Sequence, residues 1–167
     1  NKKPQVSIIV RTKNEERWIN SCLNAVFSQN YKNFEVIIID NQSKDTTIKR
    51  LSSYDDLKII KIKQFTPGKA LNKGIAVSKG EYIVCLSGHC IPTSKYWLEN
   101  LIKDLKKKEI AGIYGRQEPL PYSDDLDKRD LINLFGIEKK IQNKDPFFHN
   151  ANSAFKKKTW LKFKFDE

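Results

Sequence analysis

Apolar, β-branched runs alternate with amphipathic stretches along the first two thirds of the chain, and this order constrains the fold more than any other feature. The apolar runs read VSIIV, FEVIIID, LKIIKI and EYIVCL, and each is followed by a stretch whose apolar residues recur at helical spacing. Strands that alternate with helices in this way form parallel βαβ units with right-handed crossovers. The sequence therefore predicts one α/β domain with a Rossmann-like, mostly parallel central sheet and flanking helices.

The regular alternation ends with the stretch SKYWLENLIKDLKKK, which predicts an amphipathic helix over residues 94–108. Beyond it, we expect a strand over residues 110–115, a helix over 124–140 and a strand over 149–155. Gly80 follows the expected third helix and is interpreted as its C-terminal cap. The sequence contains no internal repeat and no linker, so the whole chain is expected to form a single domain.

The chain carries a formal net charge of +11, from 31 Lys and Arg against 20 Asp and Glu. Such a charge favours anionic partners, which include nucleic acids, acidic lipid head groups and phosphorylated small substrates. The apolar runs are too short for a membrane span, and no signal-peptide pattern is present. Cys22, Cys85 and Cys90 lack C-x-x-C spacing and are expected to be reduced, mostly buried thiols. We therefore expect a cytoplasmic location, with peripheral contact at the inner, anionic membrane face.

Polar residues follow the expected strands at the ends where open parallel sheets bind their ligands. Thr12, Asn14 and Glu15 come after the first strand, and Asp40 ends the second. A carboxylate in the position of Asp40 can accept a hydrogen bond from a nucleobase N–H or a ribose hydroxyl. Asn14 has an alternative interpretation as a simple helix cap. The chain contains neither G-x-G-x-x-G nor the P-loop pattern, which argues against dinucleotide and P-loop sites.

Several short motifs occur in an order that is specific, although each one alone is weak. The chain opens with a strand, a T-x-N-x-E-like turn, a helix and a second strand that ends in IIIDNQSKDTT. KALNKG is similar to an A-R-N-x-G helix, GEYI to a G-E-Y-I strand, and HNANSAFKKKTWLKFKFDE to an acceptor-side segment that ends in F-D-E. This ordered set resembles the inverting family 2 glycosyltransferases, which have a GT-A fold. The resemblance covers nearly the whole chain.

The resemblance implies transfer of a sugar from a nucleotide-sugar donor to the hydroxyl of a sugar or lipid-linked sugar acceptor, in the biosynthesis of surface polysaccharide or glycoconjugate. It also implies that residues 1–92 form the nucleotide-sugar-binding half of one GT-A domain, and residues 93–167 its acceptor-side part. The residues expected to contact the base, the ribose or the diphosphate are Thr12, Asn14, Glu15, Asp40, Lys69, Asn72 and Lys73.

The segment Ser87-Gly88-His89 departs from the family pattern, which places an aspartate pair, D-x-D, at this position. In the family these aspartates hold Mg²⁺ or Mn²⁺ against the donor diphosphate, because hard cations prefer oxygen ligands. His89 can ligate Mn²⁺ as a neutral imidazole, with the diphosphate supplying the oxygens, and this is the interpretation we favour. A protonated His89 can instead stabilise the diphosphate without a metal. Gly88 permits close approach of a phosphate.

His149, Asn150 and Asn152 alternate with apolar residues, and the resemblance places them on the acceptor side. We expect their segment to line the cleft opposite His89, with the amides facing sugar hydroxyls; the alternative is an edge strand with solvated amides. An inverting transferase also needs a general base near the acceptor hydroxyl. In the family this acid follows F-D-E, so we expect the base beyond Glu167 and the chain to be a fragment.

Two alternatives to an enzyme are kept open. The lost aspartates and the missing base favour a non-catalytic nucleotide-sugar-binding domain of the same fold. The net charge of +11 suggests a basic nucleic-acid-binding α/β domain. That reading is weaker, because the sequence has no RRM, KH or zinc-module pattern and its aromatic residues follow core spacing. We therefore expect no nucleic-acid partner.

Overall fold

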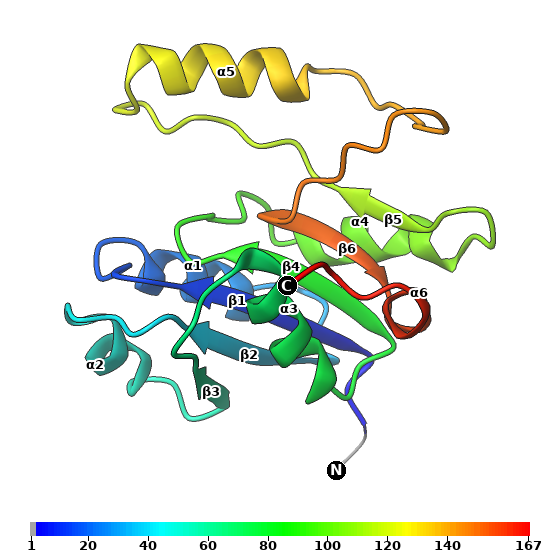
Figure 1. Ribbon diagram of the computed structural model, residues 1–167. Helices are drawn as coiled ribbons and strands as arrows, with labels where there is room; N and C mark the ends of the chain where they lie inside the picture. The colour runs from blue at the N-terminus through cyan, green and yellow to red at the C-terminus, as the bar shows by residue number, and fades with distance from the viewer. Residues whose placement is uncertain (1–2) are drawn as a thin grey trace.

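Residues 3–167 are described by the computed structural model, which is built around one six-stranded sheet (Figure 1). Its strands are β1 (Val6–Thr12), β2 (Phe34–Asp40), β3 (Leu57–Lys61), β4 (Tyr82–Ser87), β5 (Gly112–Tyr114) and β6 (Asn152–Lys156). They lie in the order β3-β2-β1-β4-β6-β5. The strands β1 to β4 pair in parallel, whereas β6 is antiparallel to both β4 and β5. The prediction of a mostly parallel α/β sheet is therefore confirmed.

Helices cover both faces of this sheet. They are α1 (Ile19–Phe27), α2 (Thr47–Leu51), α3 (Pro67–Ala76), α4 (Trp97–Lys103), α5 (Asp125–Phe135) and α6 (Lys157–Lys162), and a 3₁₀ turn at Asp104–Lys106 follows α4. One buried apolar cluster joins α1, α2 and α4 to one face of the sheet, and a second joins α3 and α6 to the other. In Figure 1, α5 stands away from the sheet. None of the helices formed by residues 3–167 combines the length and the apolar composition that crossing a bilayer requires.

The central strand β1 shows why these residues form a parallel sheet. Ile8 and Val10 belong to one apolar cluster and Ile9 to the other, and all three are completely buried. Successive side chains of a strand point to opposite faces, so a continuous apolar run fits a strand that is covered on both sides. Cys22 and Cys85 are buried among the same apolar residues, and burial raises the pKa of the Cys85 thiol to about 12.

Several element boundaries differ from those expected. The helix expected over 124–140 ends at Phe135, because Gly136 takes a φ of 54° that breaks the helical path. It begins where Asp124 Oδ1 accepts a hydrogen bond from the backbone N–H of Asp127, at 2.8 Å. The strand expected over 149–155 begins only at Asn152.

The expectation that Gly80 caps α3 was wrong. The helix ends at Ala76 with Val77 at the cap position, and Gly80 lies against the start of β1 instead. Its backbone N–H donates a hydrogen bond to Ser7 Oγ at 2.8 Å, and a Cβ on this residue would lie 2.6 Å from the backbone nitrogen of Ser7. Glycine is therefore required here for the close approach of two backbones, and not for a left-handed helix end.

The last residues of the chain are held against α3 by the side chain of Asn72. Its Oδ1 accepts hydrogen bonds from Trp160 Nε1, at 2.8 Å, and from the backbone N–H of Phe165, at 3.2 Å. Its Nδ2 donates to the carbonyl of Phe165, at 2.8 Å, and to Glu167 Oε1, at 3.0 Å. Gly68 leaves room for this segment, since a Cβ there would lie 1.7 Å from the carbonyl oxygen of Asp166. The Asn72 amide therefore serves as a clasp for the C-terminal segment.

We expect Gly80→Ala to destabilise the fold by roughly 1–3 kcal/mol, because the added methyl group overpacks the backbone of β1. The measurement is the midpoint of thermal unfolding. The control is Lys79→Ala at the exposed neighbouring position, which should change stability by less than about 0.5 kcal/mol. If both variants unfold at the wild-type midpoint, the two backbones are not in the close contact described.

We expect Asn72→Ala to cost about 1–3 kcal/mol, because it leaves the buried indole N–H of Trp160 without its acceptor. Amide hydrogen exchange should also accelerate at Phe165, whose N–H and C=O both bind Asn72. Lys73→Ala, at the exposed adjacent position, provides the control. Unaltered exchange at Phe165 in the Asn72 variant would contradict the clasp.

Candidate functional site

Parallel pairing brings the ends of three strands to one edge of the sheet. Thr12 is in register with Asp40 across β1 and β2, and Arg11 is in register with Ser87 across β1 and β4. The chain runs from β1 outward through β2 and β3, and then returns to the other side of β1 to form β4. This change of direction creates a topological switch point between β1 and β4, which is where open α/β sheets bind ligands. The strand-end residues that the sequence singled out therefore lie around one crevice.

Asp40 is fixed within this crevice by its neighbours. The residue is 1% exposed, and its Oδ1 accepts hydrogen bonds from Ser43 Oγ, at 2.5 Å, and from Thr12 Oγ1, at 3.4 Å. Among residues 3–167, its Oδ2 accepts only from the backbone N–H of Ser43, at 3.2 Å. A carboxylate oxygen can accept two hydrogen bonds, so Oδ2 retains acceptor capacity. The carboxylate is thus oriented by the protein and can still accept a further N–H or O–H.

The turn after β1 is tied to the loop after β2. Asn14 has a φ of 54°, its backbone N–H donates to Ser43 Oγ at 2.9 Å, and its Oδ1 accepts from the backbone N–H of Lys44 at 2.9 Å. The alternative that Asn14 caps the following helix is wrong, because α1 begins only at Ile19 and no side chain caps it within the described chain. Asn14 instead holds two loops together at the rim of the crevice.

His89 pairs with Glu15 across the crevice. The His89 Nδ1 lies 2.8 Å from Glu15 Oε1. This hydrogen bond raises the pKa of His89 above its ordinary value, although partial burial and the charge of Arg11 act in the opposite direction. An ionised Glu15 can only accept a hydrogen bond, so Nδ1 must carry a proton. The other nitrogen, Nε2, is then a bare ligand in the neutral imidazole and an N–H donor in the protonated one.

Arg11 lies between the β4 end and the acceptor-side segment. Its Nη2 lies 3.5 Å from Ser87 Oγ and donates to the carbonyl of Asn150 at 3.2 Å. Burial lowers the pKa of Arg11, and its Nε has no hydrogen-bond partner among residues 3–167. No role for Arg11 was expected from the sequence. The sequence feature that could have indicated such a role is a charged residue at the end of a continuous apolar strand. Burying a cation there costs free energy, so a buried arginine at a strand end is uncommon and suggests a functional site.

Gly88, directly after β4, is packed closely against the end of β1 and the turn that follows it. A Cβ on Gly88 would lie 3.1 Å from both Glu15 Cγ and Thr12 Cγ2, and the backbone N–H of Gly88 donates to the carbonyl of Arg11 at 2.9 Å. The absence of a side chain therefore lets the end of β4 approach the turn after β1. This proximity is what brings His89 within reach of Glu15.

The acceptor-side residues lie beside Ser87, and their side chains have separate partners. The carbonyl of Ala151 accepts from the backbone N–H of Ser87 at 3.0 Å. His149 Nδ1 lies 2.7 Å from Gln117 Nε2, and burial, followed by the charge of Arg11, lowers the pKa of His149. Asn152 Oδ1 accepts from Trp97 Nε1 at 2.9 Å, so this amide is used in packing against α4.

Two further observations complete this side of the site. Asn150 Oδ1 is buried without a hydrogen-bond partner in the described part of the chain, which leaves an acceptor next to Arg11. The nucleotide candidates on α3 have other partners or face solvent. Lys69 Nζ donates to Gln64 Oε1 at 3.2 Å, Lys73 is exposed, and Asn72 holds the C-terminal segment.

The side chains at this edge do not form a metal centre by themselves. No three His, Cys, Asp or Glu residues within the range 3–167 are grouped so that they could hold a metal ion. His89 offers Nε2 alone, and Ser87 lies beside the guanidinium of Arg11. One imidazole nitrogen near a cation does not match the oxygen-rich ligand set of Mg²⁺ or Mn²⁺.

Comparison with known proteins identifies relatives along most of the chain. Glycosyltransferase AglE of Haloferax volcanii is 38% identical over an alignment of 171 positions, which covers 86% of this chain and 56% of the relative. A dolichyl N-acetyl-α-D-glucosaminyl phosphate 3-β-D-2,3-diacetamido-2,3-dideoxy-β-D-glucuronosyltransferase of Methanococcus voltae is 32% identical over 122 residues, 66% of this chain and 38% of the relative. The chain thus spans about half, or less, of the length of these relatives.

The fold is shared with solved structures. The mannosyltransferase PcManGT from Pyrobaculum calidifontis, in complex with GDP-Man and Mn²⁺, superposes with a TM-score of 0.76 at 22% identity, over 100% of this chain and 48% of that one. A fragment of TarS from S. aureus, in complex with UDP-GlcNAc, gives a TM-score of 0.63 at 22% identity, over 72% and 36% of the two chains. Residues 7–160 match the sequence model described as glycosyl transferase family 2. The chain therefore belongs to glycosyl transferase family 2.

Proposed function

We propose that this chain binds a nucleotide-sugar donor and takes part in inverting transfer of its sugar to an acceptor hydroxyl, in the biosynthesis of a polysaccharide or glycoconjugate. The observation that carries the proposal is the meeting of Thr12, Asp40 and His89 at the switch-point crevice of a family 2 chain. The resemblance in fold to proteins solved with GDP-Man and with UDP-GlcNAc supports a donor of this class.

Asp40 is the residue we assign to the nucleoside. Its carboxylate is held by Ser43 and Thr12, and Oδ2 keeps acceptor capacity for a base N–H or a ribose hydroxyl. A buried acceptor that is already oriented loses little entropy on binding, which favours affinity and selectivity. The loops joined through Asn14 form the rim beside it.

The donor diphosphate would lie between His89 and Arg11. Two observations favour a protonated His89 over a metal-bound one: Glu15 raises the pKa of His89, and the crevice lacks the side chains of a metal centre within residues 3–167. A protonated His89 presents Nε2–H to a phosphate oxygen, and the adjacent guanidinium adds positive charge. Together they would stabilise the leaving diphosphate as its negative charge develops.

The acceptor would approach from the side of His149 and Asn150. Buried Asn150 Oδ1 provides an acceptor for a sugar hydroxyl, and His149 is held by Gln117. The Methanococcus voltae relative, which by its name acts on a dolichyl-phosphate-linked sugar, supports a lipid-linked sugar as one acceptor class. We do not assign the general base to Glu167, because its carboxylate accepts a hydrogen bond from Asn72.

The proposal is tested first by nucleotide binding. Thermal-shift measurements with UDP, GDP, dTDP and CMP should show stabilisation by at least one nucleotide, about 2.7 kcal/mol at a hundredfold excess over its Kd. Asp40→Ala should weaken that binding by tenfold or more, since a hydrogen bond to a charged group contributes roughly 1.5–3 kcal/mol. Asp56→Ala, at an exposed position, is the control. Equal affinity in a folded Asp40 variant would remove Asp40 from the site, and no shift with any nucleotide would contradict the donor proposal.

The state of His89 is tested by pH. Because the protonated form is the one that binds phosphate, nucleoside diphosphate affinity should increase as pH falls through the raised pKa of His89, and chelators should have no effect. Glu15 and Arg11 are the charged groups that face this ring. His89→Asp should abolish binding by repulsion, whereas His149→Gln should leave the pH profile unchanged. Binding that instead requires Mn²⁺, and that His89→Asp preserves, would establish the metal interpretation.

A further inference from the structure

The segment KKKTWLKFKF, residues 156–165, intersperses lysines with large apolar residues. The structure separates this segment into an inner and an outer set. Trp160 is 6% exposed and bonded to Asn72, while Lys156 Nζ and Lys157 Nζ donate to the carbonyls of Lys107 and Ser78. The outer set, which we call the α6 surface, consists of Lys158, Leu161, Lys162, Phe163 and Lys164.

The apolar members of the α6 surface are largely exposed. Leu161 is 65% exposed and Phe163 is 75% exposed. The three lysines take part in none of the ion pairs formed within residues 3–167, and Lys164 Nζ lies 5.6 Å from the ring centre of Trp160. Segments that bind at the membrane–water interface combine lysines with exposed aromatic and aliphatic side chains. The α6 surface has this composition, and its ammonium groups have no carboxylate partner within residues 3–167.

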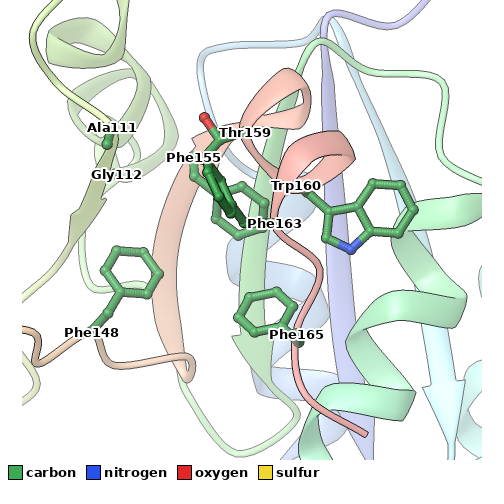
Figure 2. A pocket seen from close by; sticks show the side chains of 8 residues that line it. All are labelled: Ala111, Gly112, Phe148, Phe155, Thr159, Trp160, Phe163 and Phe165. Carbon is green, nitrogen blue, oxygen red and sulfur yellow. The ribbon is translucent and has the colours of Figure 1, made fainter.

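Two hollows flank α6 and extend this composition. One is an aromatic pocket of about 220 Å³ around which the rings of Phe148, Phe155, Phe163 and Phe165 are gathered (Figure 2). The other hollow, of about 560 Å³, is lined by Leu161, by the acidic residue Glu81 and by five lysines. These lysines are Lys3, Lys79, Lys156, Lys157 and Lys158. An apolar hollow beside a cationic one matches a molecule, or a surface, with an anionic head and an apolar interior.

We propose that the α6 surface docks this chain onto an anionic lipid bilayer. Leu161 and Phe163 would enter the boundary between head groups and acyl chains, and Lys158, Lys162 and Lys164 would contact lipid phosphates. The complementarity of charge favours this partner over a second copy of the chain, because two copies of this surface would bring like charges together. The proposal is independent of the transferase activity.

The α6 surface is separate from the nucleotide crevice. Its cationic hollow includes Ser78, Gly80 and Glu81, which precede β4 at the amino ends of the parallel strands. Asp40 lies at the carboxyl end of β2, at the opposite edge of the sheet. The cationic hollow and the Asp40 carboxylate can therefore be occupied at the same time.

The experiment is co-sedimentation of the chain with vesicles of phosphatidylcholine, alone or mixed with phosphatidylserine. We expect binding to the mixed vesicles only. Replacing Lys158, Lys162 and Lys164 by Gln should weaken it about a hundredfold, since each lysine near an anionic leaflet contributes roughly fivefold. Leu161→Gln with Phe163→Gln should also weaken binding, with every charge retained.

Matched controls separate a local surface from the diffuse net charge. Lys49, Lys58 and Lys63 are exposed near β3, at the far side of the sheet, and their replacement by Gln makes the same change in charge. Ile137→Gln with Ile141→Gln removes two apolar residues elsewhere that are at least as exposed, at 83% and 75%.

Three results would overturn the proposal: equal binding to neutral vesicles, equal loss with the control lysines, or binding that does not change with Leu161 and Phe163. Single-stranded RNA is the competing ligand. The surface would be assigned to nucleic acid instead if RNA displaces the chain from vesicles, if both ligands require the α6 lysines, and if neither requires Leu161 and Phe163. Nucleotide-induced stabilisation should be unchanged in all α6 variants, so failure here is distinguishable from failure of the proposed function.

Discussion

The backbone hydrogen bonds that join β1 in parallel to β2 on one side and to β4 on the other set the direction of three strands at once. Because all three strands end at the same edge, Thr12, Asp40 and Ser87 become neighbours although they are far apart in the sequence. The two apolar clusters hold this arrangement from both faces. The crevice is therefore a consequence of strand pairing, and its chemistry depends on which residues end the strands.

The electrostatics of this crevice differ from those of a site built on two aspartates. Ser87 and His89 stand where we expect the two carboxylates of the family pattern, and Arg11 and Glu15 lie next to them. Removing two negative charges next to a guanidinium makes the crevice more favourable for an anion and less favourable for a cation. A diphosphate and a protonated imidazole are compatible with this environment, which is why we favour the proton over the metal.

The residues near the C-terminus serve two different faces of the molecule. Asn72 binds the inner side of the segment through Trp160, Phe165 and Glu167, so that the segment has a fixed position on α3. The outer side of the same segment is then presented to solvent as alternating lysine and apolar residues, including Phe163. The clasp therefore determines which residues are available for contact with a partner, and the fold of α3 is linked to the surface of α6.

The sequence by itself determined the order of elements, the mostly parallel sheet and the strand-end positions of Asp40 and His89, because hydrophobic periodicity and strand direction are local properties. Tertiary structure decided what depends on partners distant in the chain. Asn72, expected near the ribose or the diphosphate, bonds residues near the C-terminus. Gly80, expected as a cap, packs on β1, and Arg11 contacts Ser87 and Asn150, which are distant in the sequence. A polar side chain has no preferred partner in the sequence, so only the folded chain selects one.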